Sequence, residues 1–414
     1  MTTSAEPYIA ICNNELRSVV MDDLATYGAT DIKEGFKAVR YRADQATAYS
    51  IHLKLGTASR ILKIYREGAA LSRKALFFQA TKIKWDLLLD QNKTYLVEGV
   101  AGDRGPNAPS SNEISKAIRE AIEACHKKRQ LQPPKVDLKD PHHVIVGFYY
   151  GGKICISIDT SGKSLHKRGY KVGTHPAPIK EHLAHGLLKL AGYDGSQPIM
   201  DPMCGSGTFA IEAAYIALTK APLIHRKKGD FGLEHLKNFD RTLWRETQDE
   251  ARQMRGGELP QPIYAFDISP EYVNMTKKHA LRARVERHLE IDRRDFLSAP
   301  PPPTKGLLIC NLPYGDRLSQ SDGQDLAAFY KAFGDTLKKQ YTGWRAAILT
   351  AENAPWQSIG LRASKRLKIQ NGGINCKFLI YDLYEGSHKR SKRARSSELP
   401  QDLISQNTAS DGHI

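Results

Sequence analysis

A short apolar strand that leads into a glycine turn and then a helix constrains the fold more than any other segment. The residues are IMDPMCGSGT (199–208), followed by FAIEAAYIAL. Gly205 and Gly207 let the backbone pass close to a ligand where a side chain would collide. The helix N-terminus behind them offers free N–H groups and the positive end of its dipole. No Gly-Lys-Ser/Thr follows, so a Walker-type phosphate site is not predicted.

Short apolar strands alternate with longer helical stretches from about Gly169 to Gly386. The strands are expected at 198–202, 263–267, 306–311 and 346–350, with a further buried strand at 376–384 that closes the sheet as an antiparallel pair. This alternation is typical of a wound α/β sheet with mainly parallel strands.

An acidic residue ends the second of these strands. Asp267 follows IYAF, and Ser269-Pro270 then suits an N-cap and the first residue of a helix. Beside the glycine turn, such a carboxylate can accept hydrogen bonds from ribose hydroxyls. Because Gly207 and Asp267 are too far apart for a dinucleotide fingerprint, residues 220–262 are expected to be an inserted helical segment.

Two further motifs follow strands of the same expected sheet. In IDRRDF, Asp295 could accept from an adenine amine while Phe296 packs against the base; the alternative is a loop acid beside a core aromatic. In NLPYG (311–315), Asn-x-Pro-Tyr aims an amide oxygen, a carbonyl and an aromatic ring at one spot, as methyl transfer to an exocyclic amine needs. Together the four motifs indicate S-adenosylmethionine (SAM) better than NAD or ATP.

The first 160 or so residues indicate a compact α+β region. The runs 143–149 and 153–159 are joined through Gly151-Gly152, which predicts a hairpin. SNEISKAIREAIEACHKKRQ (111–130) has one apolar face and predicts a helix.

Charge and cysteine usage limit the partners. The formal net charge of +16 favours a polyanion such as folded RNA. The six scattered cysteines form no CxxC pair, so neither a metal nor a disulfide is predicted. The chain has no long apolar run and no signal-peptide layout, which leads us to expect a cytoplasmic protein without a membrane span. The basic tail (HKRSKRAR, 388–395) is expected to be disordered.

From about Leu165 to Gly386 the chain resembles the class I SAM-dependent guanine-N2 methyltransferases of bacterial large-subunit ribosomal RNA. The matching stretches are LHKRGYK, APIKEHLA, DPMCGSGTFAIEAA, DISPE, NLPYGDRL and NGGINCKF. LGTASRILKI (55–64) and the hairpin ending in ISIDTSG resemble the ferredoxin-like segment and the RNA-binding THUMP domain that precede that catalytic domain. The resemblance implies four parts: a ferredoxin-like segment (1–60), a THUMP domain (61–164), a Rossmann-like methyltransferase domain with a mostly parallel seven-stranded sheet (165–386), and the tail (387–414).

The resemblance also implies roles for individual residues. Asp267 would hold the ribose, Asp295 with Phe296 the adenine, and Lys180, within a cofactor wall at 175–181, the SAM carboxylate. The expected cofactor-binding residues are Lys180, Asp201, Pro202, Cys204, Gly205, Gly207, Thr208, Asp267, Ile268, Asp295, Phe296 and Asn311. The expected catalytic residues are Asn311, Leu312, Pro313 and Tyr314, with Tyr314 against the flipped base.

One departure from the family pattern concerns the catalytic loop. The common Asn-Pro-Pro-Tyr is Asn-Leu-Pro-Tyr here, and because backbone makes the contact at the second position, transfer to an amine is still expected. Some relatives carry a second methyltransferase module, and a single modification is expected of this chain. The alternatives are a tRNA guanine-N2 methyltransferase, methylation of an adenine or a glutamine amide, and an rRNA-binding assembly factor without catalysis.

Overall fold

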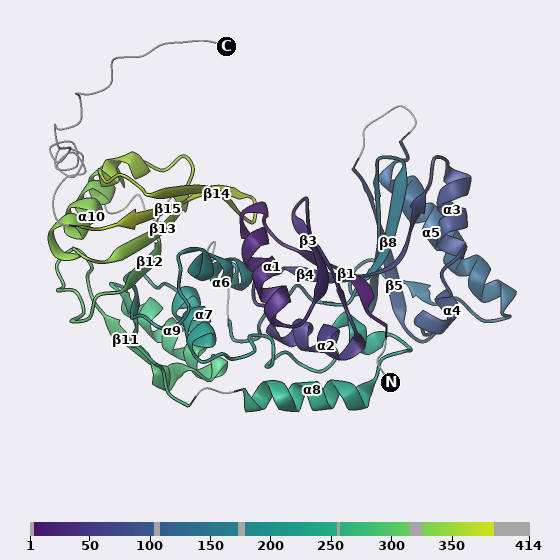
Figure 1. The fold of residues 1–414 in the computed structure, drawn as a ribbon, viewed down its shortest axis with the longest axis horizontal. Coiled ribbons are helices and arrows are strands. Elements are labelled where there is room, and N and C mark those ends of the chain that lie inside the picture. The colour runs from purple at the N-terminus through teal and green to yellow at the C-terminus, as the bar shows by residue number, and fades with distance from the viewer. Residues whose placement is uncertain (1–3, 103–107, 173–178, 255–256, 314–325, 385–414) are drawn as a thin grey trace, which may run out of the picture.

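The computed structural model describes residues 4–102, 108–172, 179–254, 257–313 and 326–384. Two sheets organise them, one of eight strands in the N-terminal region and one of seven strands in the C-terminal domain. Figure 1 shows the C-terminal domain on the left, the N-terminal segment with α1 and α2 in the centre, and the helices α3–α5 on the far right. The molecule is therefore elongated, and the segment with α1 and α2 separates its two ends.

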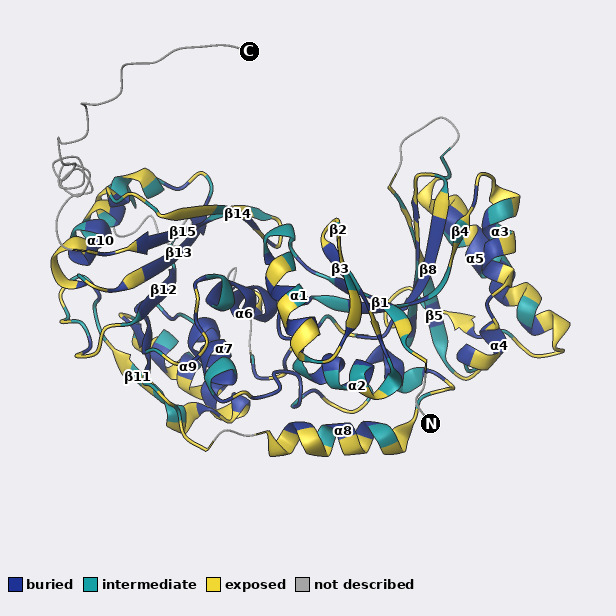
Figure 2. Cartoon of the chain, in the orientation of Figure 1, coloured by how far each residue is buried: buried dark blue, intermediate teal, exposed yellow. Residues whose placement is uncertain are grey.

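The seven-stranded sheet confirms the predicted wound α/β fold. Its order is β11-β10-β9-β12-β13-β15-β14, with the first five strands parallel and β15 antiparallel to both of its neighbours. The bounds are β9 Ile199–Asp201, β10 Ile263–Asp267, β11 Leu289–Arg293, β12 Leu307–Asn311, β13 Arg345–Ala351, β14 Lys365–Asn371 and β15 Ile374–Asp382. Central strands such as β12 and β13 are almost wholly buried (Figure 2), which explains their continuous apolar sequence.

Helices cover both faces of this sheet. One face packs on α6 (Glu181–Leu190), α7 (Thr208–Ala217) and α9 (Pro270–Ala283). The other packs on α10 (Leu326–Gln340) and on the short 3-10 helix η6 (Trp356–Ile359). The 3-10 helix η3 (Glu286–His288) leads into β11.

The eight-stranded sheet is continuous through the whole N-terminal region. Its order is β2-β3-β1-β4-β8-β7-β5-β6. The bounds are β1 Glu6–Ile11, β2 Thr30–Gly35, β3 Ala38–Ala43, β4 Arg60–Ala69, β5 Thr94–Ala101, β6 Lys135–Val136, β7 His143–Tyr150 and β8 Lys153–Asp159. Strand β4 pairs with β1 on one side and β8 on the other, so the expected boundary at 60/61 falls at the start of the strand that both halves share.

The N-terminal region contains six helices among the described residues, and each buries at least one apolar side chain. They are η1 (3-10) Asn14–Leu16, α1 Arg17–Thr26, α2 Gln45–Lys54, α3 Arg73–Thr81, α4 Trp85–Leu88 and α5 Ser111–Lys128. Helix α5 begins with a capping box between Ser110 and Glu113 and buries the predicted apolar face. The predicted hairpin is the β7–β8 pair.

The segment between the glycine turn and β10 braces the molecule. It contains η2 (3-10, Gly232–His235) and α8 (Arg241–Gln253), which confirms the predicted helical insertion. Trp244 packs in one core cluster with residues of α2, and the backbone N–H of Lys237 donates to the carbonyl of Leu88. Figure 1 shows α8 running beneath α2. The insertion therefore ties the C-terminal domain to both halves of the N-terminal region.

A buried ionic cluster joins the two regions directly. Glu212 of α7 pairs with Arg168 at 3.4 Å and with Nδ1 of His185 at 2.9 Å, and Glu212 and Arg168 are both fully buried. The guanidinium of Arg168 donates to the carbonyls of Leu165 and Gly56. A Cβ on Gly56 would lie 2.7 Å from Nε2 of His185, so glycine is needed for this approach.

Three other expectations concern cysteines, metals and membranes. All six cysteines are free thiols, and all except Cys125 are buried. Within the described ranges, no group of three His, Cys, Asp or Glu side chains is placed to hold a metal ion. No helix among the described residues has the length and hydropathy needed to span a bilayer.

Candidate active site

The glycine turn lies between β9 and α7, at the carboxyl edge of the seven-stranded sheet. Gly205 (φ 52°) and Gly207 (φ 77°) both take the left-handed conformation that favours glycine. A Cβ on Gly207 would lie 2.6 Å from Cγ2 of Thr276 on α9. The turn is therefore pressed against α9, and its shape depends on both glycines.

The other residues of the turn face inward. The Cys204 thiol lies 3.5 Å from Oγ1 of Thr276, and Oγ1 of Thr208 lies 3.2 Å from Oγ of Ser206. Pro202, Cys204 and Thr208 are buried. Because these three side chains are buried in the protein, any contact of these residues with a cofactor would be made by their backbone atoms.

Two carboxylates meet at this edge. Asp267, at the end of β10, accepts from the backbone N–H groups of Gly205 (2.9 Å) and Ser269 (3.0 Å). Asp201, at the end of β9, is buried and accepts from the N–H of Met203 at 3.3 Å. Burial, together with the nearby charge of Asp267, raises the pKa of the Asp201 carboxyl well above its usual range. Asp201 has no ion pair with any described Lys or Arg.

Asp295 and Phe296 follow β11 with different environments. The Asp295 carboxylate accepts from the N–H of Leu297 (3.0 Å) and the hydroxyl of Ser298 (3.0 Å). The Phe296 ring is buried against Phe333 and Tyr341, at centroid distances of 4.8 and 5.2 Å. The Phe296 ring is thus a core aromatic, as the alternative interpretation of the motif predicted. Any contact between Phe296 and adenine would be made by its backbone.

Ile268, directly after Asp267, is an apolar side chain left in solvent. It is 61% exposed, although it lies between a buried strand and a helix. Next to the Asp267 carboxylate, which is expected to hold the ribose, this exposed apolar side chain offers a surface for a planar base.

Asn311 ends β12, the strand next to β9. Its Oδ1 atom is buried and has no hydrogen-bond partner in the described part of the chain. The next residue, Leu312, donates its N–H to the carbonyl of Leu349 (2.9 Å), and its side chain is fully buried in the core. The carbonyl of Pro313 accepts from the Tyr330 hydroxyl at 3.1 Å. Tyr314 lies outside the described residues.

Leu312, whose side chain is buried, stands at the position of the first proline in Asn-Pro-Pro-Tyr. Because that side chain packs with Cys310 and Tyr330 in the core, an apolar residue other than proline fits there. The backbone carbonyl of Leu312 is then the group that can face a substrate.

The expected cofactor wall is described only in part. Residues 175–178 lie outside the described ranges. Lys180 is exposed and is the N-cap residue of α6. Beside it, Lys171 pairs with buried Glu181 at 3.4 Å and donates to the carbonyl of Ile179 at 3.0 Å. Burial lowers the pKa of Lys171, although the charge of Glu181 opposes that shift.

Two residues of α9 were missed by sequence reasoning. The Thr276 hydroxyl donates to the carbonyl of Gly205 at 2.9 Å. Nδ1 of His279 lies 2.9 Å from the carbonyl of Ser206, while its Nε2 accepts from the N–H of Val172 at 3.1 Å. The only signal was that these buried polar residues are three apart on an otherwise apolar helix face.

The site fits a cationic cofactor that carries a planar base. Burial and the nearby charge of Asp267 disfavour the ionised form of Asp201, and a positive group bound beside the two residues would favour it. SAM carries a sulfonium and an ammonium group, and Oδ1 of Asn311, which no described residue contacts through a hydrogen bond, suits a donor such as an amine. Asp201, Gly205 and Gly207 would hold the methionine part, and Asp267, Ile268 and Asp295 the adenosine.

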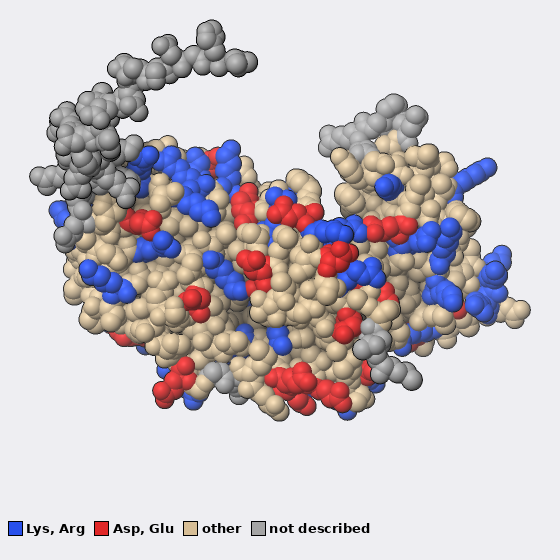
Figure 3. Space-filling view, in the orientation of Figure 1, with Lys and Arg blue, Asp and Glu red and all other residues tan. Residues whose placement is uncertain are grey.

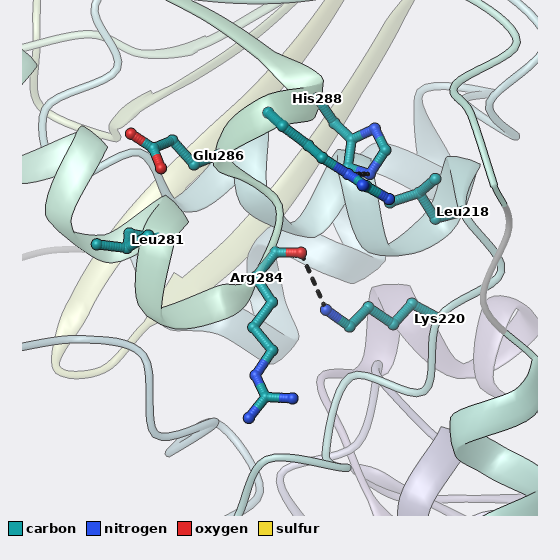
Figure 4. Close-up of a pocket in the computed structure, with 7 residues that line it drawn as sticks. Leu218, Lys220, Leu281, Arg284, Glu286 and His288 are labelled. Carbon is teal, nitrogen blue, oxygen red and sulfur yellow. Dashed lines mark hydrogen bonds between the residues drawn. The ribbon is translucent and has the colours of Figure 1, made fainter.

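A separate cavity of about 380 Å³ lies at the opposite edge of this sheet, near the amino end of β11 (Figure 4). Its lining residues are Leu218, Lys220, Leu281, Arg284, Glu286, Arg287 and His288. The Lys220 ammonium donates to the carbonyls of Ala283 (2.7 Å) and Arg284 (3.4 Å). None of the motif residues lines this cavity, so it plays no part in the candidate site.

Three family models match successive parts of the chain. Residues 168–380 match the RMKL-like methyltransferase domain, residues 72–159 the THUMP domain, and residues 7–62 the RlmL ferredoxin-like domain. The matches follow the same order as the structural regions described above.

Whole proteins resemble the chain over most of its length. It is 31% identical over 383 residues to slr0064 of Synechocystis sp., which is provisionally named an RNA methyltransferase. The match covers 92% of this chain and 98% of that relative. It is 34% identical over 385 residues to the ribosomal RNA large subunit methyltransferase K/L of Shewanella frigidimarina, covering 92% of this chain but 52% of the relative. The chain thus spans about half the length of the K/L relatives.

A solved structure shares both the fold and the arrangement of its parts. SMU.472, provisionally described as a methyltransferase and complexed with SAH, superimposes with a TM-score of 0.80. It is 25% identical, and the match covers 93% of this chain and all of that one.

Proposed function

The chain belongs to the RMKL-like methyltransferase family, and from that premise we propose that it methylates the exocyclic N2 amine of a guanosine in RNA. SAM is the methyl donor. The preferred substrate is 23S ribosomal RNA, as the name of the K/L relatives suggests.

The observation that carries this proposal is the buried Oδ1 of Asn311, which has no hydrogen-bond partner among the described residues and lies at the same sheet edge as the glycine turn. β9 and β12 are neighbouring parallel strands, with Met200 opposite Leu308. Their carboxyl ends therefore reach the same edge, where a wound α/β sheet binds its ligands. A buried acceptor without a partner is costly unless a ligand supplies the donor.

The chemistry needs acceptors more than a strong base. The N2 lone pair of guanine is delocalised into the ring, so the amine is a poor nucleophile. Oδ1 of Asn311 and the carbonyl of Leu312 would accept from its two N–H groups and localise the lone pair. SAM, when bound, supplies a methyl group on a positively charged sulfur. Transfer of that methyl group from sulfur to N2 would leave the amine positively charged, and Oδ1 of Asn311 and the carbonyl of Leu312 would hold its protons until one passes to solvent.

Hydrogen bonds from α10 and β13 fix the backbone of the loop that follows Asn311. The Tyr330 hydroxyl donates to the Pro313 carbonyl and lies 2.6 Å from Oγ1 of Thr350 on β13. Because Tyr330 uses its proton for Pro313, Thr350 donates to Tyr330. This chain of bonds fixes the backbone on which the acceptors stand.

RNA is the favoured substrate class for two reasons. The THUMP match covers residues 72–159, and the formal net charge is +16. A guanine within RNA must leave its stack to reach the site, and phosphate contacts would offset that cost. A tRNA guanine remains the second candidate; a catalytically inactive assembly factor would not need the acceptor of Asn311 beside the glycine turn.

Nucleoside mass spectrometry of separated rRNA and tRNA from a deletion strain tests the substrate. We expect N2-methylguanosine to fall in the large-subunit rRNA fraction and to return when the wild-type gene, but not an Asn311→Ala variant, is supplied. Loss from tRNA alone would select the second candidate. Unchanged N2-methylguanosine in both fractions would refute the proposal.

A further inference from the structure

Three cations gather on one face of the β14–β15 hairpin. Arg366 and Lys368 are two residues apart on β14, so both point to the same face. Lys377 of β15 lies directly opposite Lys368 in the strand register. Like charges directly across a strand pair repel, so this arrangement disfavours the hairpin unless an anion joins it. We call these three residues the cationic strip.

In the part of the chain that the structure describes, the cationic strip contacts an aromatic ring and forms no ion pair with a carboxylate. The Lys377 ammonium lies 4.5 Å, and the Arg366 guanidinium 5.4 Å, from the centroid of the Trp356 ring on η6. No described Asp or Glu forms an ion pair with any member of the strip, whereas Arg345 and Lys338 of the same domain pair with Asp382 and Asp335. A cation–π contact fixes a cation without neutralising it. Among the described residues, therefore, no carboxylate offsets the positive charge of the strip.

The cationic strip begins beside the candidate active site. Lys377 lies opposite Thr350 in the β13–β15 register. Thr350 bonds to Tyr330, which holds the carbonyl of Pro313. Adjacent strands are about 4.8 Å apart, so Lys377 lies one strand away from the support of the catalytic loop.

The strip also reaches toward the N-terminal region. β14 is the edge strand of its sheet, and the Asn13 amide donates to the carbonyl of Gln370 at its far end. Figure 1 shows β14 running from the C-terminal domain toward α1, and Figure 3 shows Lys and Arg gathered over that part of the surface. An extended polyanion could therefore follow the strip from the catalytic loop toward the N-terminal region.

We propose that the cationic strip binds the phosphates of the RNA strand next to the nucleotide that enters the active site. This rests on the proposed function, since it takes RNA as the substrate. Arginine offers a planar fork and lysine a compact charge, and both bind phosphate oxygens without reading sequence. The strip thus holds the flanking strand while the target base leaves its stack. Trp356 is a positioning residue that aligns Arg366 and Lys377.

The test compares two charge-matched triple variants of the full chain. The strip variant is Arg366→Gln, Lys368→Gln and Lys377→Gln. The control variant is Arg245→Gln, Lys277→Gln and Lys278→Gln, which removes the same charges from exposed positions on α8 and α9. Binding of an unmodified large-subunit rRNA transcript is measured as a function of salt, and SAM affinity by calorimetry.

The strip variant should bind the transcript at least tenfold more weakly than the wild type does. The slope of log K against log salt is negative, and its magnitude should decrease by about 2, as the loss of three phosphate contacts implies. Its SAM affinity should match that of the wild type, and its melting temperature should be no lower, because the variant removes the repulsion between Lys368 and Lys377. A strip variant whose affinity and salt slope equal those of the control variant would overturn the proposal. If wild type methylates another base while the strip variant still loses RNA affinity, the guanine assignment fails and the strip stands.

Trp356 gives a second test that does not remove charge. Trp356→Phe keeps an aromatic face and should keep the RNA affinity, whereas Trp356→Leu should raise KM for RNA and leave kcat nearly unchanged. Equal KM in both variants would show that the ring does not position the strip.

Discussion

The backbone N–H of Gly205 donates a hydrogen bond of 2.9 Å to Oδ2 of Asp267, which joins two motifs 62 residues apart in the sequence. The same carboxylate holds the N–H of Ser269 through Oδ1 at 3.0 Å. Each carboxylate oxygen can accept more than one hydrogen bond, so these bonds are compatible with a ribose diol. The glycine turn and the Asp267 carboxylate are thus joined before any ligand binds.

Asp201→Asn should separate stability from cofactor binding. Because the pKa of Asp201 is raised in the folded protein, the carboxyl stabilises the fold below its ordinary pKa and loses that contribution as pH rises through the folded value. At neutral pH and without SAM, the variant should therefore melt at the same or a higher temperature than wild type. Its SAM affinity should fall at least tenfold. Thermal melts with and without SAM check both effects; a lower melting temperature together with unchanged SAM affinity would contradict our role for Asp201.

Gly207→Ala should damage the turn itself. The new Cβ would clash with Thr276 at 2.6 Å, and φ of 77° is strained for alanine. We expect a loss of about 1 to 3 kcal/mol in the free energy of unfolding, with weaker SAM binding. Gly373→Ala is the matched control, because its Cβ would meet nothing within 4 Å. Chemical denaturation of both variants gives the comparison, and equal stability would show that the turn tolerates a side chain.

Glu212→Gln should loosen the junction between the two regions. Arg168 would stay buried without an ionised partner, at a cost of about 3 to 5 kcal/mol. Burial opposes ionisation of Glu212, but the charges of Arg168 and His185 outweigh it and lower its pKa below the usual 4.5.

The pH dependence of that variant follows from the lowered pKa. A carboxylate with a lowered pKa contributes stability above the unfolded value and loses it as pH falls through the folded value. The difference in melting temperature between wild type and Glu212→Gln should therefore be largest above about pH 4.5 and should decrease as the pH falls below that value. Exposed Glu246→Gln is the control. A gap that widens in acid would mean that the Glu212 pKa is not lowered.

Local sequence patterns predicted five of the seven strands of the C-terminal sheet (β9, β10, β12, β13 and β15), because each is an apolar run of a few residues. The edge strands β11 and β14 were not predicted, because both are polar and largely exposed. β9, its glycine turn and α7 lie where the segment IMDPMCGSGT predicted them. The β7–β8 hairpin likewise lies where the two runs around Gly151-Gly152 predicted it. The patterns could not show that β4 is shared by two halves of one sheet, because pairing partners are distant in sequence. The contact of Trp244 with α2 is hidden for the same reason.

The candidate site divides in the same way. The backbone positions of Asp201, Asp267 and Asn311 followed from strand ends, which share one edge in a parallel sheet. The inward packing of Phe296 and the support from Thr276, His279 and Tyr330 depend on tertiary contacts, which periodicity does not report. The roles of individual residues toward SAM and the target base remain predictions.

The proposed methyl transfer depends most on Asn311. One comparison of wild type with Asn311→Ala tests this directly: SAM affinity by calorimetry, and turnover by labelled-methyl transfer to unmodified rRNA. We predict SAM affinity within about threefold of wild type and turnover lower by about 100-fold or more, as for loss of one preorganised polar contact to a transition state. Wild-type turnover by Asn311→Ala would contradict the central claim that this buried amide oxygen holds the amine that accepts the methyl group.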